Sequence, residues 1–222
     1  MEFDEVIETR RSVHQYTDED IDDETLEAIF EQVRYAPSSF DLQPWEFLVV
    51  RDDDNLTRLQ EVANGQETVG ESAATVVVLG NTDPSAHADR VFDDWLDKGY
   101  IPSEDVRDNL LGVVENMSSM PDEERRLWTT RSTSLAAMAL MHAAWNEGVA
   151  SCPMEGFDAD ALVDEFDIEE GYEPVMLVTL GYAPEEAPDQ EKPRKLRRPV
   201  DEIVHYETFD PEAESPTPSA DD

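Results

Sequence analysis

The chain has 222 residues, and 54 Asp and Glu side chains against 16 Lys and Arg give a formal net charge of −38. This length suits one domain with a full-sized hydrophobic core, and so negative a surface disfavours nucleic-acid and anionic-membrane partners. No apolar run approaches the roughly 20 residues that span a bilayer, and the N-terminus lacks the basic-then-apolar order of a signal peptide. With one cysteine, Cys152, these features predict a soluble, cytoplasmic protein without an internal disulfide.

The excess of acidic residues is typical of the surface of a halophilic protein, in which abundant salt screens self-repulsion. An acidic metal buffer is the alternative, but no run of carboxylates follows a calcium-loop spacing, so we expect no metal site. The cations concentrate at two places, Arg10–Arg11 and residues 192–198. They are suited either to a bound phosphate or to ion pairs with surrounding carboxylates, and composition does not decide between the two.

Helices and strands intermix in the first half of the chain. Residues 2–9 carry apolar side chains at helical spacing, and a second helix begins at Asp22 or Asp23 and ends before Pro37. Residues 45–50 read as a strand, and Leu56, Leu59 and Val62 mark a further helix. The apolar run Thr75–Leu79, bounded by Gly80, predicts a central strand.

The middle of the chain is dominated by helical patterns. Two amphipathic stretches, Val91–Leu96 and Val106–Val114, lie in the segment 84–121. A long helix follows over about 123–147, and Gly148 can end it in the left-handed conformation. This helix is apolar on nearly every side between Leu135 and Trp145, so it must be buried on every side, which in a chain of this size indicates a dimer interface.

The last third predicts a short helix that begins at Asp158, a buried strand over Val175–Leu180 and a terminal strand over Val200–Tyr206. Residues 210–222 are acidic and nearly free of large apolar groups, and we expect a disordered tail there. The domain therefore comprises residues 1–209, and its class is α+β or layered α/β.

Four short blocks carry candidate chemistry. Residues 10–16 begin with two arginines and a serine, which suit a phosphate, although surface Arg-Arg pairs commonly bind carboxylates. Residues 36–45 hold two prolines, two serines and two aromatics, in a polar-lined turn or an ordinary entry into a strand. Residues 152–157 place a glycine beside backbone amides just before a helix, where N–H groups can face a ligand. Residues 195–199 form a second cationic cluster.

These blocks together resemble the nitroreductase family of FMN-dependent oxidoreductases over residues 2 to about 207. The matching features are an Arg-x-Ser near the start, an Ala-Pro-Ser-Ser-x-x-x-Gln-Pro-Trp turn, an apolar strand ending in Leu79-Gly80, a Met-Glu-Gly-Phe turn and a late Arg-x-Pro. The resemblance implies an α+β fold of three α/β/α layers, with a central mixed, mostly antiparallel sheet and an exchanged C-terminal segment. It also implies a homodimer with FMN sites at the subunit interface.

The resemblance further implies a set of cofactor-binding residues. The FMN phosphate and the adjoining ribityl chain would be bound by Arg10, Arg11, Ser12, His14, Lys195 and Arg197. The partner subunit would place against the flavin ring the residues Pro37, Ser38, Ser39, Asp41 and Gln43. The segment that runs along the edge of the flavin ring would comprise Pro153, Met154, Glu155 and Gly156. A backbone amide near Glu155 and Gly156 would lie close to flavin N5. No catalytic side chain is implied.

Two positions depart from the family pattern. Asp41 stands where Asn is common, and an ionised Asp accepts hydrogen bonds without donating them. His14 stands where Lys or Arg is common, so the positive charge that this side chain can offer to the phosphate depends on pH. The flavin contact that the family often takes from the region of Asn64, Gly65 and Gln66 cannot be assigned to one of them from the sequence.

The activity that the resemblance implies is electron transfer from NAD(P)H through FMN to a small electron-poor acceptor, such as a nitroaromatic or a quinone. The reaction would proceed as a ping-pong of two half-reactions. Two alternatives remain open: the same fold with another flavin reaction, such as reductive dehalogenation or flavin breakdown, and a non-enzymatic flavin-binding protein.

Overall fold

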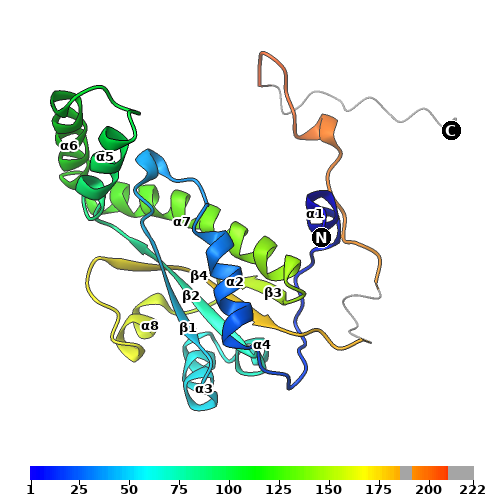
Figure 1. Ribbon diagram of the computed structural model, residues 1–222. Coiled ribbons are helices and arrows are strands. Elements are labelled where there is room, and N and C mark those ends of the chain that lie inside the picture. The colour runs from blue at the N-terminus through cyan, green and yellow to red at the C-terminus, as the bar shows by residue number, and fades with distance from the viewer. Residues whose placement is uncertain (186–191, 210–222) are drawn as a thin grey trace, which may run out of the picture.

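A computed structural model of the chain describes residues 1–185 and 192–209, and at its centre is a four-stranded sheet (Figure 1). In spatial order its strands are β1 (Trp45–Val50), β2 (Ala74–Asn81), β4 (Tyr172–Gly181) and β3 (Ala150–Met154). Neighbouring strands all pair antiparallel. β2 lies inside the sheet and is buried along nearly its whole length, which confirms the central strand predicted from its apolar run.

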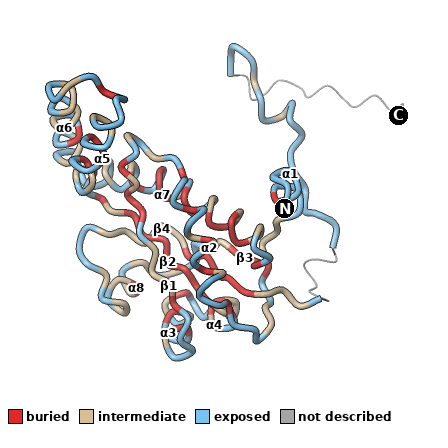
Figure 2. The backbone as a smooth tube through the Cα atoms, in the orientation of Figure 1, coloured by how far each residue is buried: buried red, intermediate tan, exposed pale blue. Residues whose placement is uncertain are grey.

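Helices cover both faces of the sheet, in three layers. On one face α2 (Asp23–Val33) and α7 (Asp122–Asn146) pack on a large apolar core. On the other face α3 (Asp53–Val62), the short α4 (Glu67–Gly70) and α8 (Ala159–Glu165) enclose a second core. Figure 2 shows the buried backbone concentrated in the sheet and in the faces of the helices that meet it. The α+β class and the predicted arrangement in three layers are therefore confirmed.

Two helices stand apart at one end of the molecule, where α5 (Ala88–Asp97) and α6 (Glu104–Ser118) pack side by side (Figure 1). They correspond to the two amphipathic stretches expected in residues 84–121. Their shared core contains the fully buried ring of Phe92, together with Leu42 from the turn that precedes β1. This pair of helices is thereby fastened to that turn.

Local signals in the sequence fix several helix ends. The Asp22 carboxylate accepts a hydrogen bond from the Thr25 N–H at 2.7 Å, and Asp158 accepts one from the Ala161 N–H at 3.0 Å, as helix-capping residues do. Beyond α7, Gly148 adopts a φ of +79°, the left-handed conformation that ends helices. The predicted starts of α2 and α8 and the end of α7 are confirmed.

One strand was not predicted and one local prediction is wrong, and strand pairing explains both. No sequence pattern predicts a strand before the Met-Glu-Gly-Phe turn, but β3 covers Ala150–Met154, because β4 pairs with it along one edge and the Ser12 backbone bridges to it along the other. The strand expected over Val200–Tyr206 is instead a 3-10 turn at Val200–Glu202. That segment runs away from the chain's own sheet and is mostly exposed (Figures 1 and 2), so it has no strand edge there to pair with.

The predicted mixed sheet is antiparallel in its four strands, and parallel pairing is limited, in the described ranges, to the bridge between Ser12 and Ser151. The acidic tail predicted for 210–222 lies outside the described residues. None of the helices in the described part of the chain is both long and apolar enough to cross a membrane.

The sequence predicts that α7 is buried on every side. Its own chain covers only one side of it. Its inner face is buried by Ala136, Ala137 and Leu140, whereas the side chain of Leu135 is 49% exposed and that of Met138 is 37% exposed. The outer face of this helix, the longest described, therefore exposes large apolar side chains that its own chain does not cover.

The distribution of charge leads to a prediction about salt. The buried polar residues described are all serines and threonines, so the described carboxylates are left at or near the surface, where they repel one another. The Debye length falls from about 10 Å at 0.1 M to about 3 Å at 1 M salt, so the thermal unfolding midpoint should rise steadily from dilute to molar KCl. Calorimetry along this series measures it, with sucrose of matched osmolality as the control for solvent exclusion. An unchanged or falling midpoint in KCl contradicts the halophilic interpretation.

Candidate functional site

The first candidate block is held against the sheet as soon as α1 (Phe3–Thr9) ends. The Val13 N–H donates to the Ser151 carbonyl at 3.0 Å, which places residues 10–13 alongside β3. The Tyr16 hydroxyl bonds the Thr179 hydroxyl at 2.8 Å and the Val13 carbonyl at 2.9 Å, and burial raises the pKa of Tyr16. Block 10–16 is therefore fixed to two strands.

Two further arginines, Arg194 and Arg197, act electrostatically on Arg10 of this block. Arg10 is half-buried, burial lowers its pKa, and the positive charges of Arg194 and Arg197 lower it further. Its Nη1 atom is buried and has no hydrogen-bond partner in the described parts of the chain. In those parts no carboxylate forms an ion pair with any of the three. A concentration of unpaired positive charge in so acidic a chain fits a bound anion, and phosphate matches the donor set.

The other residues predicted near the phosphate are Arg11, Ser12, His14 and Lys195. Ser12 lies in the bridge to β3, and Arg11 donates from Nη1 to the Lys192 carbonyl at 2.7 Å. The side chains of His14 and Lys195 are exposed, and the Lys195 carbonyl accepts from the Arg197 guanidinium at 3.2 Å. The structure thus joins the first and the fourth blocks, which are about 180 residues apart in the chain.

The third block leaves β3 beside the first. Pro153 and Met154 are the last residues of the strand, and the chain then turns through Glu155 and Gly156. The N–H groups of Glu155 and Gly156 donate to no oxygen of the described residues. Two free amide donors just beyond a buried strand are able to face an acceptor atom of a ligand.

Two side chains fix the orientation of that turn. The Gly156 carbonyl accepts from Asn64 Nδ2 at 2.8 Å and from Gln66 Nε2 at 2.7 Å. A Cβ atom on Gly156 would lie 3.1 Å from Gln66 Nε2, so the close approach favours glycine. Sequence reasoning recognised the region of Asn64 and Gln66 but not its partner, because no spacing in the chain relates it to residue 156.

The second block, the turn before β1, is strained. Phe40, Asp41 and Gln43 have φ angles of 54°, 54° and 46°, in the left-handed region that non-glycine residues seldom adopt. Hydrogen bonds hold them there, since Ser38 Oγ accepts from the Gln43 N–H at 2.9 Å and the Gln43 amide donates to Asp41 Oδ1 at 3.2 Å. Strain of this kind often accompanies functional sites.

Within one chain, this turn does not lie near Arg10, Arg194 and Arg197, which we call the arginine group. The Ser39 N–H donates to Ser132 Oγ at 3.5 Å, whereas Thr9, next to Arg10, accepts from Trp145 Nε1 at 2.8 Å. Ser132 and Trp145 both belong to α7, and at about 1.5 Å per residue they lie about 20 Å apart along its axis. The predicted site is therefore split between the two halves of this helix.

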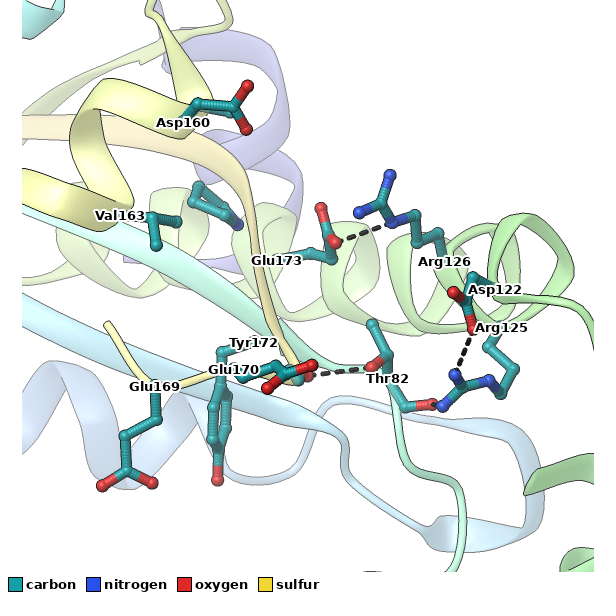
Figure 3. A pocket seen from close by; sticks show the side chains of 13 residues that line it. Thr82, Asp122, Arg125, Arg126, Asp160, Val163, Glu169, Glu170, Tyr172 and Glu173 are labelled. Carbon is teal, nitrogen blue, oxygen red and sulfur yellow. Dashed lines mark hydrogen bonds and ion pairs between the residues drawn. The ribbon is translucent and has the colours of Figure 1, made fainter. Parts of the chain in front are cut away.

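A cavity of about 400 Å³ lies elsewhere, between the start of α7, the start of β4 and α8 (Figure 3). Its lining contains none of the predicted site residues. The arginines in its wall are already paired, Arg125 with Asp122 at 2.5 Å and Arg126 with Glu173 at 2.7 Å. These charges neutralise one another locally, and we assign the cavity no ligand.

Comparison with known proteins agrees with this arrangement. A model described as the nitroreductase family matches residues 7–182. The chain is 32% identical over 206 residues to MhqN of Bacillus subtilis (strain 168), whose provisional name is NAD(P)H nitroreductase. That match covers 92% of this chain and 98% of MhqN.

Solved structures show the same fold. The Bacillus subtilis protein ydfN, described provisionally as a nitroreductase, superimposes with a TM-score of 0.84 at 32% identity over 92% of this chain and 98% of its own. A protein of Exiguobacterium sibiricum, also described provisionally as a nitroreductase and crystallised in complex with FMN, has a TM-score of 0.81 at 28% identity. The two chains are covered to 93% and 97%. The match over residues 7–182 and these relatives together show that the chain belongs to the nitroreductase family.

Proposed function

We propose that this protein is an FMN-dependent oxidoreductase that passes electrons from NAD(P)H to a small electron-poor acceptor, such as a nitroaromatic or a quinone. The observation that carries the proposal is that Arg10, Arg194 and Arg197 have no carboxylate partner among the described residues, in a chain of net charge −38. The FMN phosphate would be bound by Arg10, Ser12, Lys195 and Arg197. The FMN complex of the Exiguobacterium sibiricum protein supports the choice of ligand.

The turn after β3 would receive the flavin ring. When bound, FMN supplies the centre that accepts and returns electrons, while the protein sets its position and electrostatic surroundings. The free N–H groups of Glu155 and Gly156 would donate to the ring edge, and dipoles of this polarity favour the added electron density of the reduced form. Asn64 and Gln66 would keep these donors in place by holding the Gly156 carbonyl.

We propose further that two chains are needed to complete each site. In one chain, the turn at residues 37–43 and the segment next to Arg10 contact α7 at places about 20 Å apart along its axis. A partner subunit would therefore supply that turn to the flavin ring. Large exposed apolar side chains are most numerous on α1, on α7 and in the segment 192–209, and others are Tyr35, Tyr100, Val113 and Met120. None of those described is on α3, α4 or α8, and this distribution supports a homodimer built on the α7 face.

The pair of helices α5 and α6 would shape access to the ring. Phe40, in the strained turn, contacts Phe92 of α5 edge to face, with ring centroids 6.4 Å apart. If the turn lies against the flavin of the partner subunit, this contact brings α5 to the mouth of the same site. The choice of acceptor would then depend on α5 and α6.

Anaerobic spectroscopy tests the proposed reaction. The purified protein should be yellow, excess NADH or NADPH should bleach its flavin band, and addition of a quinone or a nitroaromatic should restore it. Separate bleaching and recovery are expected of a ping-pong exchange. A flavin that binds but is not bleached would identify a non-enzymatic flavoprotein, and bleaching without recovery by any nitroaromatic or quinone would indicate another flavin reaction.

A further inference from the structure

Arg194 forms hydrogen bonds that its position in the sequence does not suggest. From the cationic segment near the C-terminus, its Nη2 atom donates to the Glu8 carbonyl and, at 3.3 Å, to the Arg10 carbonyl. In the opposite direction, Arg11 donates to the Lys192 carbonyl at 2.7 Å. Two arginines thus bind residues 8–11 to residues 192–194 by crossed contacts with the main chain.

The place where Arg194 binds is the end of α1. The last carbonyls of a helix have no partner within it and carry partial negative charge, so a guanidinium there satisfies both needs. One of the two hydrogen bonds reaches the main chain of Arg10, whose N–H also donates to the Val6 carbonyl at 3.0 Å and whose side chain carries the buried, unpartnered Nη1 atom. Arg194 therefore contacts the residue that bears this nitrogen.

Helix capping by Arg194 does not explain why positive charges without carboxylate partners occur together near Arg10. Elsewhere in the described chain most arginines form ion pairs with carboxylates: Arg34, Arg51, Arg58, Arg107, Arg125, Arg126 and Arg198. The positive charges of Arg194 and Arg197 instead act on Arg10, and none of the three has a carboxylate partner among the described residues. Like charges brought together repel, and an anion between them removes that cost.

We propose that Arg194 is a positioning residue of the phosphate site. It holds the Arg10 main chain, so that the Arg10 side chain points to the anion, and it adds a third positive charge to the site. The ligand group is a phosphate monoester, and the inference rests on the proposed function, in which that ester is the phosphate of FMN.

The test compares FMN with riboflavin, which has the same ring and no phosphate. Arg194→Ala should weaken FMN binding by about tenfold to a hundredfold and leave riboflavin binding unchanged, since only FMN uses the site. Arg198→Ala is the matched control, because this nearby arginine is paired with Glu202 at 3.3 Å, and it should alter neither affinity. Flavin fluorescence titration at one fixed salt concentration measures all of these.

A second variant covers the case in which Arg194→Ala does not fold. Arg194→Gln keeps N–H donors for the carbonyls and removes the charge, so it should still lower the affinity for FMN and not that for riboflavin. Equal losses for both flavins, or no loss for FMN, would overturn the positioning role. A wild-type protein that binds neither flavin would instead overturn the proposed function.

Discussion

Arg10→Ala should lower the affinity for FMN by about tenfold to a hundredfold, because a hydrogen bond to a charged group typically contributes roughly 1.5–3 kcal/mol. The Nη1 atom of Arg10 is buried without a partner in the described residues, so it is able to donate to a bound anion. Fluorescence titration of apoprotein with FMN measures the loss. Arg197→Ala should show a loss of the same order.

Arg90→Ala provides the control for this experiment. Arg90 is exposed on α5, outside the four blocks, and its removal changes the net charge of the chain by the same single unit. Its affinity for FMN should equal that of the wild type. If Arg10→Ala and Arg197→Ala also bound FMN as tightly as the wild type, the assignment of the phosphate site would be wrong.

Leu135→Glu should dissociate the protein into monomers and release FMN at the same time. Leu135 is half-exposed on the face of α7 that its own chain leaves uncovered, and burying an unpaired carboxylate in an interface costs several kcal/mol. The dimer dissociation constant should rise by at least about a hundredfold. Light scattering in high salt gives the mass, and absorbance in the flavin band gives the occupancy.

The choice of residue matters for this test. Ala139, in the same apolar stretch, packs against the core of its own chain, so a charge there would test folding instead of assembly. Ala161→Glu on α8, in the opposite helical layer, is the control, and it should remain dimeric with its flavin bound. A wild-type protein that is monomeric with full FMN occupancy would refute the two-subunit site and the role of the turn at residues 37–43.

Local patterns were enough to place most elements of the fold. The central strand β2 follows from its apolar run, and the starts of α2 and α8 follow from Asp22 and Asp158, because a capping hydrogen bond spans only a few residues. The family itself could be inferred from the order of the four blocks, and the match over residues 7–182 confirms it. Signals of this kind act over short stretches of chain, so the sequence displays them directly.

Other features depend on contacts between distant segments. β3 is a strand because β4 and Ser12 pair with its two edges, and its own residues include a proline and no β-branched side chain. For the same reason the segment at 200–206, which has no sheet edge beside it, is not a strand. Strand formation requires a partner, and the partner is not encoded near the strand.

By itself, the sequence placed most helices and strands through periodicity and capping, and the resemblance carried by its four blocks implied the layered α+β architecture, the family and the candidate site residues. Only the tertiary structure decided how the site is assembled. It brought Arg194 to the end of α1, placed Asn64 and Gln66 on the Gly156 carbonyl, and separated the turn at 37–43 from Arg10 along α7. Each of these relations involves segments that are far apart in the chain. The local sequence of one segment does not indicate its partner, and hydrogen-bond geometry in the folded protein determines which segments meet.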